Sequence, residues 1–371
     1  MTQIGIGIIG GGYMGKAHSV AMAAVGAVFD TKLRPRLEMI CNTTEAGAAD
    51  KARAFGFARS TADWRQLVND QKVEAIVIAS PQDSHCEIAL AALALGKPVL
   101  CEKPLATSLE DCRKLVATAE TSGVVNMIGF NYIRTPASQL AREIVASGEI
   151  GGMIYFRGEH TEDFLANAAT DASWRTRGRT FGNMGDLSPH PINAALAIAG
   201  PIRSVIAEIE TIHKTRLGPN GPETVANDDQ AQLMVRFASG VMGHIFSSRV
   251  ATGRKMGYAY EVHGTKGALR FDQEDQNALW LYKGDQAANR QGFTKILTGP
   301  LHPDYKPFCL GPGHGTGYQD QIIIEARDFL EAIAAGTPKW PTFRDGLAVA
   351  QVVEAAWRSH EQRRWVQVGE V

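Results

Sequence analysis

Three glycines, Gly10, Gly12 and Gly15, form a G-x-G-x-x-G motif near the start of the chain. The motif lies between a β-branched apolar stretch, Ile4–Gly10, which predicts a buried strand, and an alanine-rich stretch, Tyr13–Val25, which predicts a helix. In this context the first glycine permits a tight turn, the second lets the backbone approach a pyrophosphate, and the third lets helix and strand pack closely. The helix N-terminus adds unpaired N–H groups and a positive dipole end. The motif therefore predicts a dinucleotide site.

The ends of the neighbouring predicted strands would complete this site. Asn42 follows the second strand, where an NAD enzyme usually carries Asp or Glu to bind the adenosine ribose. Asn42 can hydrogen-bond a 2′-hydroxyl and does not repel a 2′-phosphate, and no arginine is adjacent to it. We expect NAD, with NADP as the alternative if Arg53 or Arg34 reaches the site. The expected cofactor residues are Gly10, Gly12, Tyr13, Met14, Gly15, Asn42, Ser80, Pro81, His85, Glu102 and Lys103.

Lys103 is the first candidate for chemistry beyond cofactor binding. It directly follows a predicted strand, Val99–Cys101, so it belongs to the ligand end of a parallel sheet. Its ammonium group could hydrogen-bond a reacting hydroxyl and stabilise the developing alkoxide. Pro104 fixes the backbone just after it. The alternative is an exposed surface lysine, which is the commoner fate of this residue type.

The second candidate is the segment Asp186-Leu-Ser-Pro-His190. Ser188 is expected as the N-cap and Pro189 as the first residue of a helix, which puts His190 in the first turn. The positive end of the helix dipole there favours the neutral imidazole that a general base for alcohol oxidation needs. Asp186 could orient that ring or contact substrate. The alternative is a structural histidine near a helix start.

The segment GKPVLCEKPLA, residues 96–106, makes the pattern specific. Together with the glycine motif, with His85 in ASPQDSH and with the GDLSPH segment, it resembles the Gfo/Idh/MocA oxidoreductase family over nearly the whole chain. The resemblance implies that Lys103 lies at the junction of cofactor and substrate and that Asp186 and His190 are catalytic. The family often has Asp three residues after this histidine, whereas this chain has Asn193.

A polar and aromatic set is expected at the substrate, because carbohydrate sites combine a flat apolar surface with several hydrogen-bonding groups. The alternative is a solvated loop. The HTED segment that begins at His160 could also suggest metal ligands, but no cysteine or second histidine stands at a useful spacing, so we expect no metal. The expected substrate residues are Asn131, Tyr132, His160, Trp174, Arg175, Asp186 and His190.

The elements that must position these residues fall into two patterns. Up to residue 130, apolar strands alternate with helices, which predicts an α/β, doubly wound parallel sheet of the Rossmann type. From residue 131 to 371, hairpin-like strands predict an α+β domain with a mainly antiparallel, open β-sheet, for substrate binding and oligomerisation. Two late helices are expected, Asp320–Ala335 and Gly346–Arg363, after a long Gly/Pro-rich loop, Gly299–Gly317.

Composition excludes several classes of protein. The net charge of −1 gives no basic field for nucleic acid or for a membrane surface, and the N-terminus does not read as a signal peptide. Five cysteines without a CxxC pair argue against a disulfide framework and favour a reducing cytoplasm. Apolar runs in the second sheet, such as Leu233–Val235 and Val241–Met242, exceed what one-sided burial needs and predict a homodimer or homotetramer.

The predicted reaction is NAD(P)-dependent oxidation of a secondary hydroxyl of a sugar or cyclitol. His190 would take the hydroxyl proton, Lys103 would polarise the oxygen, and Asp186 would assist. One alternative is an NADPH-dependent keto-sugar reductase of the same fold. Another is a cofactor-binding regulator without turnover, although such a protein has no chemical reason to keep both Lys103 and His190.

Overall fold

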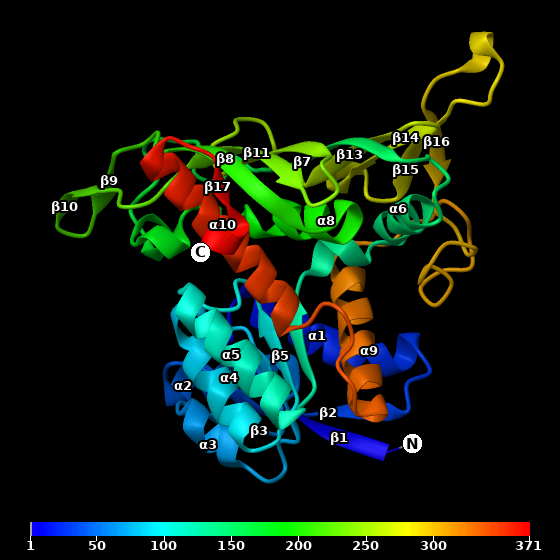
Figure 1. Ribbon diagram of the computed structural model, residues 1–371. Coiled ribbons are helices and arrows are strands. Elements are labelled where there is room, and N and C mark those ends of the chain that lie inside the picture. The colour runs from blue at the N-terminus through cyan, green and yellow to red at the C-terminus, as the bar shows by residue number, and fades with distance from the viewer. Residues whose placement is uncertain (1) are drawn as a thin grey trace. The chain divides into compact units, whose positions relative to one another are not determined.

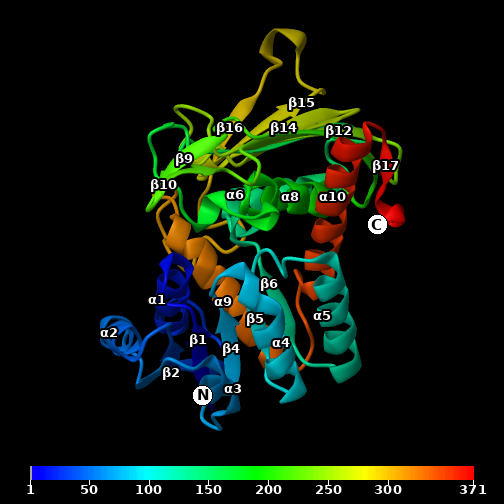
Figure 2. The same ribbon diagram turned by 90° about the vertical axis from the view of Figure 1, so that its left-hand side faces the viewer.

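The computed structural model describes residues 2–371, which fall into two compact units (Figures 1 and 2). The first unit contains the chain through Arg134 together with Thr316–Ala348, and the second contains Thr135–Gly315 and Val349–Val371. The predicted division of the chain at residue 130 therefore does not include the later segment, Thr316–Ala348, that returns to the first unit. No described helix is both long and apolar enough to cross a membrane.

A six-stranded parallel sheet forms the centre of the first unit, with helices on both sides (Figure 1). Its strand order, β3-β2-β1-β4-β5-β6, is the doubly wound order, as the alternating sequence pattern predicted. The strands are β1 (Thr2–Ile9), β2 (Leu33–Cys41), β3 (Arg59–Thr61), β4 (Ala75–Ile78), β5 (Val99–Glu102) and β6 (Asn126–Gly129). Every residue of β4, β5 and β6 is buried, because helices cover both faces of a parallel sheet.

The helices of this unit begin and end at residues with clear physical reasons. Thr44 accepts a hydrogen bond from the Gly47 N–H at the start of α2, and Ser108 does the same for the Asp111 N–H of α5. Gly123 closes α5 in the left-handed conformation that glycine favours. The helices are α1 (Tyr13–Val28), α2 (Glu45–Phe55), α3 (Trp64–Asn69), α4 (His85–Ala94), α5 (Leu109–Ser122) and α9 (Tyr318–Ala335).

Helix α9 belongs to the first unit although it follows the whole second sheet in sequence. It packs along α1, and the Gln319 side chain donates to the Ala17 carbonyl oxygen at 2.9 Å. The prediction of a helix over Asp320–Ala335 was correct, but its packing partner could not be read from local pattern.

A nine-stranded sheet forms the centre of the second unit, in the order β16-β15-β14-β13-β7-β12-β11-β8-β17. All neighbouring pairs are antiparallel except β7 and β12, so the predicted mainly antiparallel sheet is confirmed. A separate hairpin pairs β9 with β10. The strands are β7 (Met153–Thr161), β8 (Ile202–Glu210), β9 (Thr215–Gly218), β10 (Gly221–Thr224), β11 (Gln230–Phe237), β12 (Met242–Ser248), β13 (Ala259–Gly264), β14 (Gly267–Asp272), β15 (Ala278–Lys283), β16 (Thr294–Leu297) and β17 (Val366–Gln367).

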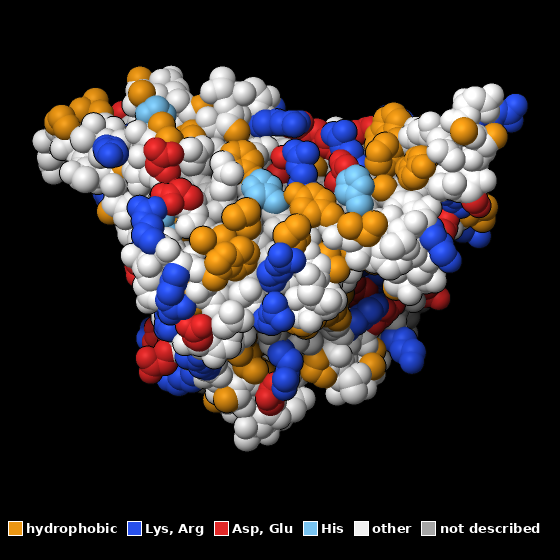
Figure 3. Space-filling model, turned by 45° about the horizontal axis from the view of Figure 1, so that its top comes forward, with side chains coloured by type: hydrophobic (Ala, Val, Ile, Leu, Met, Phe, Trp, Pro, Cys, Tyr) orange, Lys and Arg blue, Asp and Glu red, His pale blue; other side chains and the backbone are white. Residues whose placement is uncertain are grey.

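Helices α6 (Pro136–Ala146) and α8 (Pro189–Ala199) cover one face of this sheet (Figure 1). The short α7 (Asn183–Asp186) precedes α8, and α10 (Phe343–Gln362) passes from the first unit into the second. The other face is open. There β11 alternates buried Leu233 and Val235 with Met234, which is 55% exposed, and Met242 of β12 is 51% exposed. Figure 3 shows hydrophobic and histidine side chains gathered over the strands.

Candidate active site

The turn between β1 and α1 has the backbone geometry of a phosphate-binding loop. Gly10 has φ +106°, and a Cβ there would lie 2.3 Å from the Ala79 carbonyl oxygen. A Cβ on Gly15 would lie 1.8 Å from the Gly10 oxygen, so this glycine lets α1 pack against the turn. A Cβ on Gly12 would meet no protein atom within 4 Å. Gly12 is also the N-cap of α1, so the turn leaves room for a ligand at a helix N-terminus.

Asn42 and Lys51 border this turn. A Cβ on Gly11 would lie 2.9 Å from the Lys51 Cγ and 3.4 Å from the Asn42 Nδ2. Sequence reasoning missed Lys51, because it lies within α2, well after the end of β2. The two arginines considered for a 2′-phosphate have other partners: Arg53 binds the Asp50 carboxylate, and Arg34 donates to backbone oxygens of the α1 C-terminal region.

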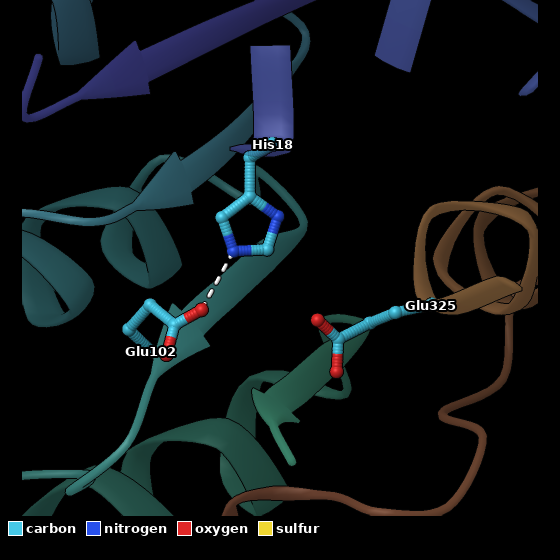
Figure 4. Close-up of side chains that lie close together, drawn as sticks. All are labelled: His18, Glu102 and Glu325. Atoms are coloured by element: carbon cyan, nitrogen blue, oxygen red, sulfur yellow. Dashed lines mark hydrogen bonds and ion pairs between the residues drawn. The ribbon is translucent and has the colours of Figure 1, made fainter. Parts of the chain in front are cut away.

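The turn that carries Lys103 is held on both sides by buried histidines. Before Lys103, the Glu102 carboxylate lies 2.7 Å from the His18 Nε2 (Figure 4). After it, the His85 Nδ1 lies 2.8 Å from the Pro104 carbonyl oxygen and its Nε2 lies 3.0 Å from that of Ser80. Burial lowers the pKa of His85. Both ring nitrogens of His85 thus face backbone of the β4 and β5 turns, so its ring fixes the turns that should meet the cofactor.

An aromatic group connects α9 to the glycine turn. The Tyr318 ring stacks on Tyr13 with centroids 5.9 Å apart and lies 6.1 Å from the Tyr132 ring. Its hydroxyl lies 3.4 Å from the Met14 sulfur, and burial raises its pKa. Tyr13, Met14 and Tyr132 were predicted site residues, whereas Tyr318 was missed because no motif surrounds it. Asn131, the remaining predicted residue here, donates to the Gln321 side chain of α9 at 3.1 Å.

In the second unit, His190 and His160 are brought together. His190 lies in the first turn of α8, is 5% exposed, and its ring centroid is 5.2 Å from that of His160. The His160 Nε2 lies 2.9 Å from the Glu162 carboxylate, and its Nδ1 lies 3.2 Å from the Leu187 oxygen. The Tyr258 ring, which sequence reasoning missed, packs against both histidines. The arrangement gives His190 a buried, oriented ring.

The predicted start of α8 is confirmed, with Ser188 as the N-cap residue and Pro189 as the first residue of the helix. Ser188 stands at the N-cap position, but its backbone is already helical and its side chain makes no capping hydrogen bond. Its hydroxyl instead bonds that of Ser247 on β12 at 2.6 Å. The short helix α7 runs almost directly into α8, so the chain enters α8 without the extended residue that a side-chain cap requires.

Asp186, Arg175 and Trp174 form a second group in the same unit. The Arg175 Nη1 donates to the Asp186 carboxylate at 2.6 Å. The guanidinium also lies over the Trp174 ring, 4.4 Å from its centroid, and 5.4 Å from that of Phe164. Trp174 is 55% exposed. The group presents an exposed ring beside a fixed cation and carboxylate, which suits a polyol.

Buried polar side chains just before β11 and just after β12 support this group, and none was predicted. Arg249 is 1% exposed and donates to the Arg175 oxygen at 2.7 Å, to the Phe181 oxygen at 3.2 Å, and to Asp229 at 3.0 Å. The Asn227 amide donates to the oxygens of Arg175 and Gly178. The only sequence signal for these residues was Arg249, a charged residue directly after an apolar strand.

A glycine turn between the first strand and the first helix of a doubly wound parallel sheet defines a dinucleotide-binding protein. Residues 4–130 match the oxidoreductase family described as having an NAD-binding Rossmann fold, and residues 138–270 match the GFO/IDH/MocA C-terminal domain. The chain belongs to the Gfo/Idh/MocA oxidoreductase family.

Its relatives include characterised dehydrogenases. The levoglucosan dehydrogenase of Pseudarthrobacter phenanthrenivorans is 36% identical over the full length of both chains. A levoglucosan dehydrogenase solved in complex with NADH and levoglucosan has a TM-score of 0.96 and 37% identity, with 99% of this chain and 100% of that chain covered. The inositol 2-dehydrogenase of Rhizobium meliloti is 26% identical over 98% of each chain.

Proposed function

We propose that this protein oxidises a secondary hydroxyl of a sugar or cyclitol, with NAD as the hydride acceptor. The observation that carries the proposal is the turn around Lys103, because buried histidines hold the residues on both sides of this lysine at the ligand end of the sheet, which suits a catalytic donor. The levoglucosan and inositol dehydrogenases among the relatives support the substrate class.

The glycine turn fits the cofactor. Gly12 leaves open space beside the first N–H groups of α1, which is the cradle that a pyrophosphate needs. The bound cofactor supplies a nicotinamide ring that accepts a hydride. Asn42 would bind the adenosine ribose, and Arg34 and Arg53 have other partners, which favours NAD over NADP.

The remaining steps are assigned to side chains of this chain. The imidazole of His190 takes the hydroxyl proton, and the Lys103 ammonium donates a hydrogen bond to the oxygen as alkoxide charge develops. Asp186, paired with Arg175, orients substrate hydroxyls, and Trp174 offers its ring to the apolar face of the sugar. His18 and His85 hold the Lys103 turn and stay outside the chemistry.

A panel of candidate substrates tests the proposal. Purified protein is mixed with NAD or NADP and with inositols, hexoses, anhydrosugars or disaccharides, and nicotinamide reduction is followed. We expect turnover with NAD and at least one anhydrosugar or cyclitol. Tight NADH binding without turnover on any sugar, in either direction, would contradict the proposal.

We further propose a homodimer or homotetramer that works in the cytoplasm. The open face of the nine-stranded sheet, with Met234 and Met242 more than half exposed, supports self-association. Five free cysteines support a reducing compartment. A light-scattering mass equal to one chain would contradict the oligomer, and a native disulfide found by mass spectrometry would contradict the compartment.

A further inference from the structure

The buried ring of His160 lies beside the turn that carries His190. On strand β7, a Cβ at Gly158 would lie 3.6 Å from the Cβ of Pro191 in α8, so His160, two residues further along the strand, points to the same helix. Helix α8 covers this face of the sheet (Figure 1). His160 is 2% exposed, and its ring meets that of His190 edge-on. The proposed reaction gives this second histidine no task.

Both ring nitrogens of His160 face hydrogen-bond acceptors. The Nε2 lies 2.9 Å from a carboxylate oxygen of Glu162, and the Nδ1 lies 3.2 Å from the Leu187 carbonyl oxygen. A carbonyl and an ionised carboxylate only accept hydrogen bonds, so the ring can donate to both only as an imidazolium with two N–H groups. The Leu187 oxygen also accepts from the backbone N–H of His190, at 3.2 Å. His160 therefore holds the same carbonyl group that orients the backbone of His190.

The charged groups of this unit leave the Glu162 carboxylate to His160. Among residues 2–371, His160 is the only basic side chain that pairs with Glu162. The neighbouring carboxylates have cations of their own: Asp186 pairs with Arg175, Asp163 with Lys255, and Asp229 with Arg249, whose charge also acts on Asp228. Two further arginines, Arg142 and Arg216, donate to backbone oxygens. An imidazolium on His160 therefore supplies the positive charge that balances Glu162.

We propose that His160 and Glu162 are positioning residues for His190: the Glu162 carboxylate keeps His160 doubly protonated, and the ring in turn fixes the Leu187 carbonyl at the start of α8. Because Glu162 carries the opposite charge, the pair adds little net charge beside His190, and its effect is on position. His160, which the sequence suggested as a substrate residue, then acts through His190 and not on the sugar. The role of His190 in this inference rests on the proposed function.

Nitrogen NMR of the ring tests the protonation directly and needs neither cofactor nor sugar. Protein with isotope-labelled histidine is measured at about pH 8, well above the ordinary histidine pKa of about 6.5. The signals of His160 are identified by their loss in His160→Gln. In the wild type we expect two protonated ring nitrogens, whereas in Glu162→Gln we expect a neutral ring with one.

Glu261→Gln is the matched control for the loss of a carboxylate beside a histidine. Glu261 of β13 pairs with His263, two residues further along, at 2.7 Å, as Glu162 does with His160. Glu261 and His263 alternate with the buried Tyr260 and Val262, so they face the open side of the sheet and not α8. This variant should leave the His160 signals as they are in the wild type.

Single-turnover reduction of NAD measures the effect on the reaction. In E162Q, hydride transfer should fall about tenfold or more, because a displacement of about 1 Å at a reacting group can cost about a hundredfold in rate. The affinities for NADH and for the sugar should stay within about twofold of the wild type. Glu162→Asp, which keeps the carboxylate, should restore most of the lost rate, and E261Q should react as the wild type does.

Two results would overturn the proposal. A neutral His160 ring in the wild type would mean that Glu162 does not set its protonation. A weaker affinity for the sugar in E162Q, with hydride transfer unchanged, would mean that this carboxylate contacts the sugar itself. Since the NMR signals require neither NAD nor a sugar, their failure is distinguishable from failure of the proposed sugar oxidation.

Discussion

Substitution of Arg249 by methionine tests whether the buried network positions the substrate group. Arg249 is 1% exposed and Asp229 is completely buried, so the variant leaves a carboxylate without its charged partner. Two backbone N–H groups, of Ile212 and His213, still bind Asp229 and limit the damage. Breaking one side of a buried ion pair costs about 3–5 kcal/mol, so we expect a loss of about 3 kcal/mol in the free energy of unfolding.

The same variant should act on substrate binding. The variant lacks the guanidinium that donates to the carbonyl oxygens of Arg175 and Phe181, so the segment between these two residues should become more mobile. We expect the KM for sugar to rise by about tenfold or more, with NADH affinity unchanged, because the glycine turn lies in the other unit. Urea unfolding and steady-state kinetics measure the two effects.

Arg236→Met is the matched control, because Arg236 lies on β11 and donates to a backbone oxygen at the surface. It should change the free energy of unfolding by less than about 1 kcal/mol and leave the KM unchanged. An R249M variant within about 1 kcal/mol of the wild type would refute the energetic reasoning. A large loss of stability with an unchanged KM would refute the positioning role.

Four further predictions concern single residues. Gly12→Ala meets no protein atom, so it should keep wild-type stability while NADH affinity falls at least about tenfold, whereas Gly15→Ala should destabilise the fold in a thermal melt because its Cβ overlaps the Gly10 oxygen. Asn42→Asp should raise the preference for NAD over NADP, measured as the ratio of kcat/KM values, because a carboxylate repels a 2′-phosphate; an unchanged ratio would mean that Asn42 does not face the ribose. Burial raises the pKa of Asp228 from 3.8 to about 6, so the folded state holds its proton more tightly than the unfolded state does, and stability should fall by up to about 3 kcal/mol as pH rises from about 4 to about 6. In the Asp228→Asn variant this fall in stability between about pH 4 and about pH 6 should vanish. Urea unfolding of the wild type and of the variant at several pH values measures the difference.

Much of the fold was predictable because its signals are local. The strands β4 and β5 are short apolar runs, and the glycine motif lies where strand and helix meet, so pattern alone placed the cofactor turn. Local signals did not predict β3, which has three residues and no apolar run. They also did not predict α6, although Thr135 is its N-cap and Pro136 its first residue.

The candidate site was predictable only in part. Lys103, Asp186 and His190 stand in recognisable motifs, whereas Tyr318 and Arg249 act through partners far away in sequence. Arg249, for example, lies 74 residues from Arg175. Periodicity and composition describe neighbours along the chain, so they carry no information about such contacts. The contact between His18 and Glu102, which lie 84 residues apart, likewise emerged only with the fold.

The most direct test of the account is a single-turnover measurement of NAD reduction with the best sugar of the panel. Wild type, Lys103→Ala and His190→Ala are compared, and NADH affinity is determined for each in parallel. We expect hydride transfer to fall by at least about a hundredfold in both variants while NADH still binds. Hydride transfer at the wild-type rate in either variant would contradict the assignment of the chemistry to Lys103 and His190.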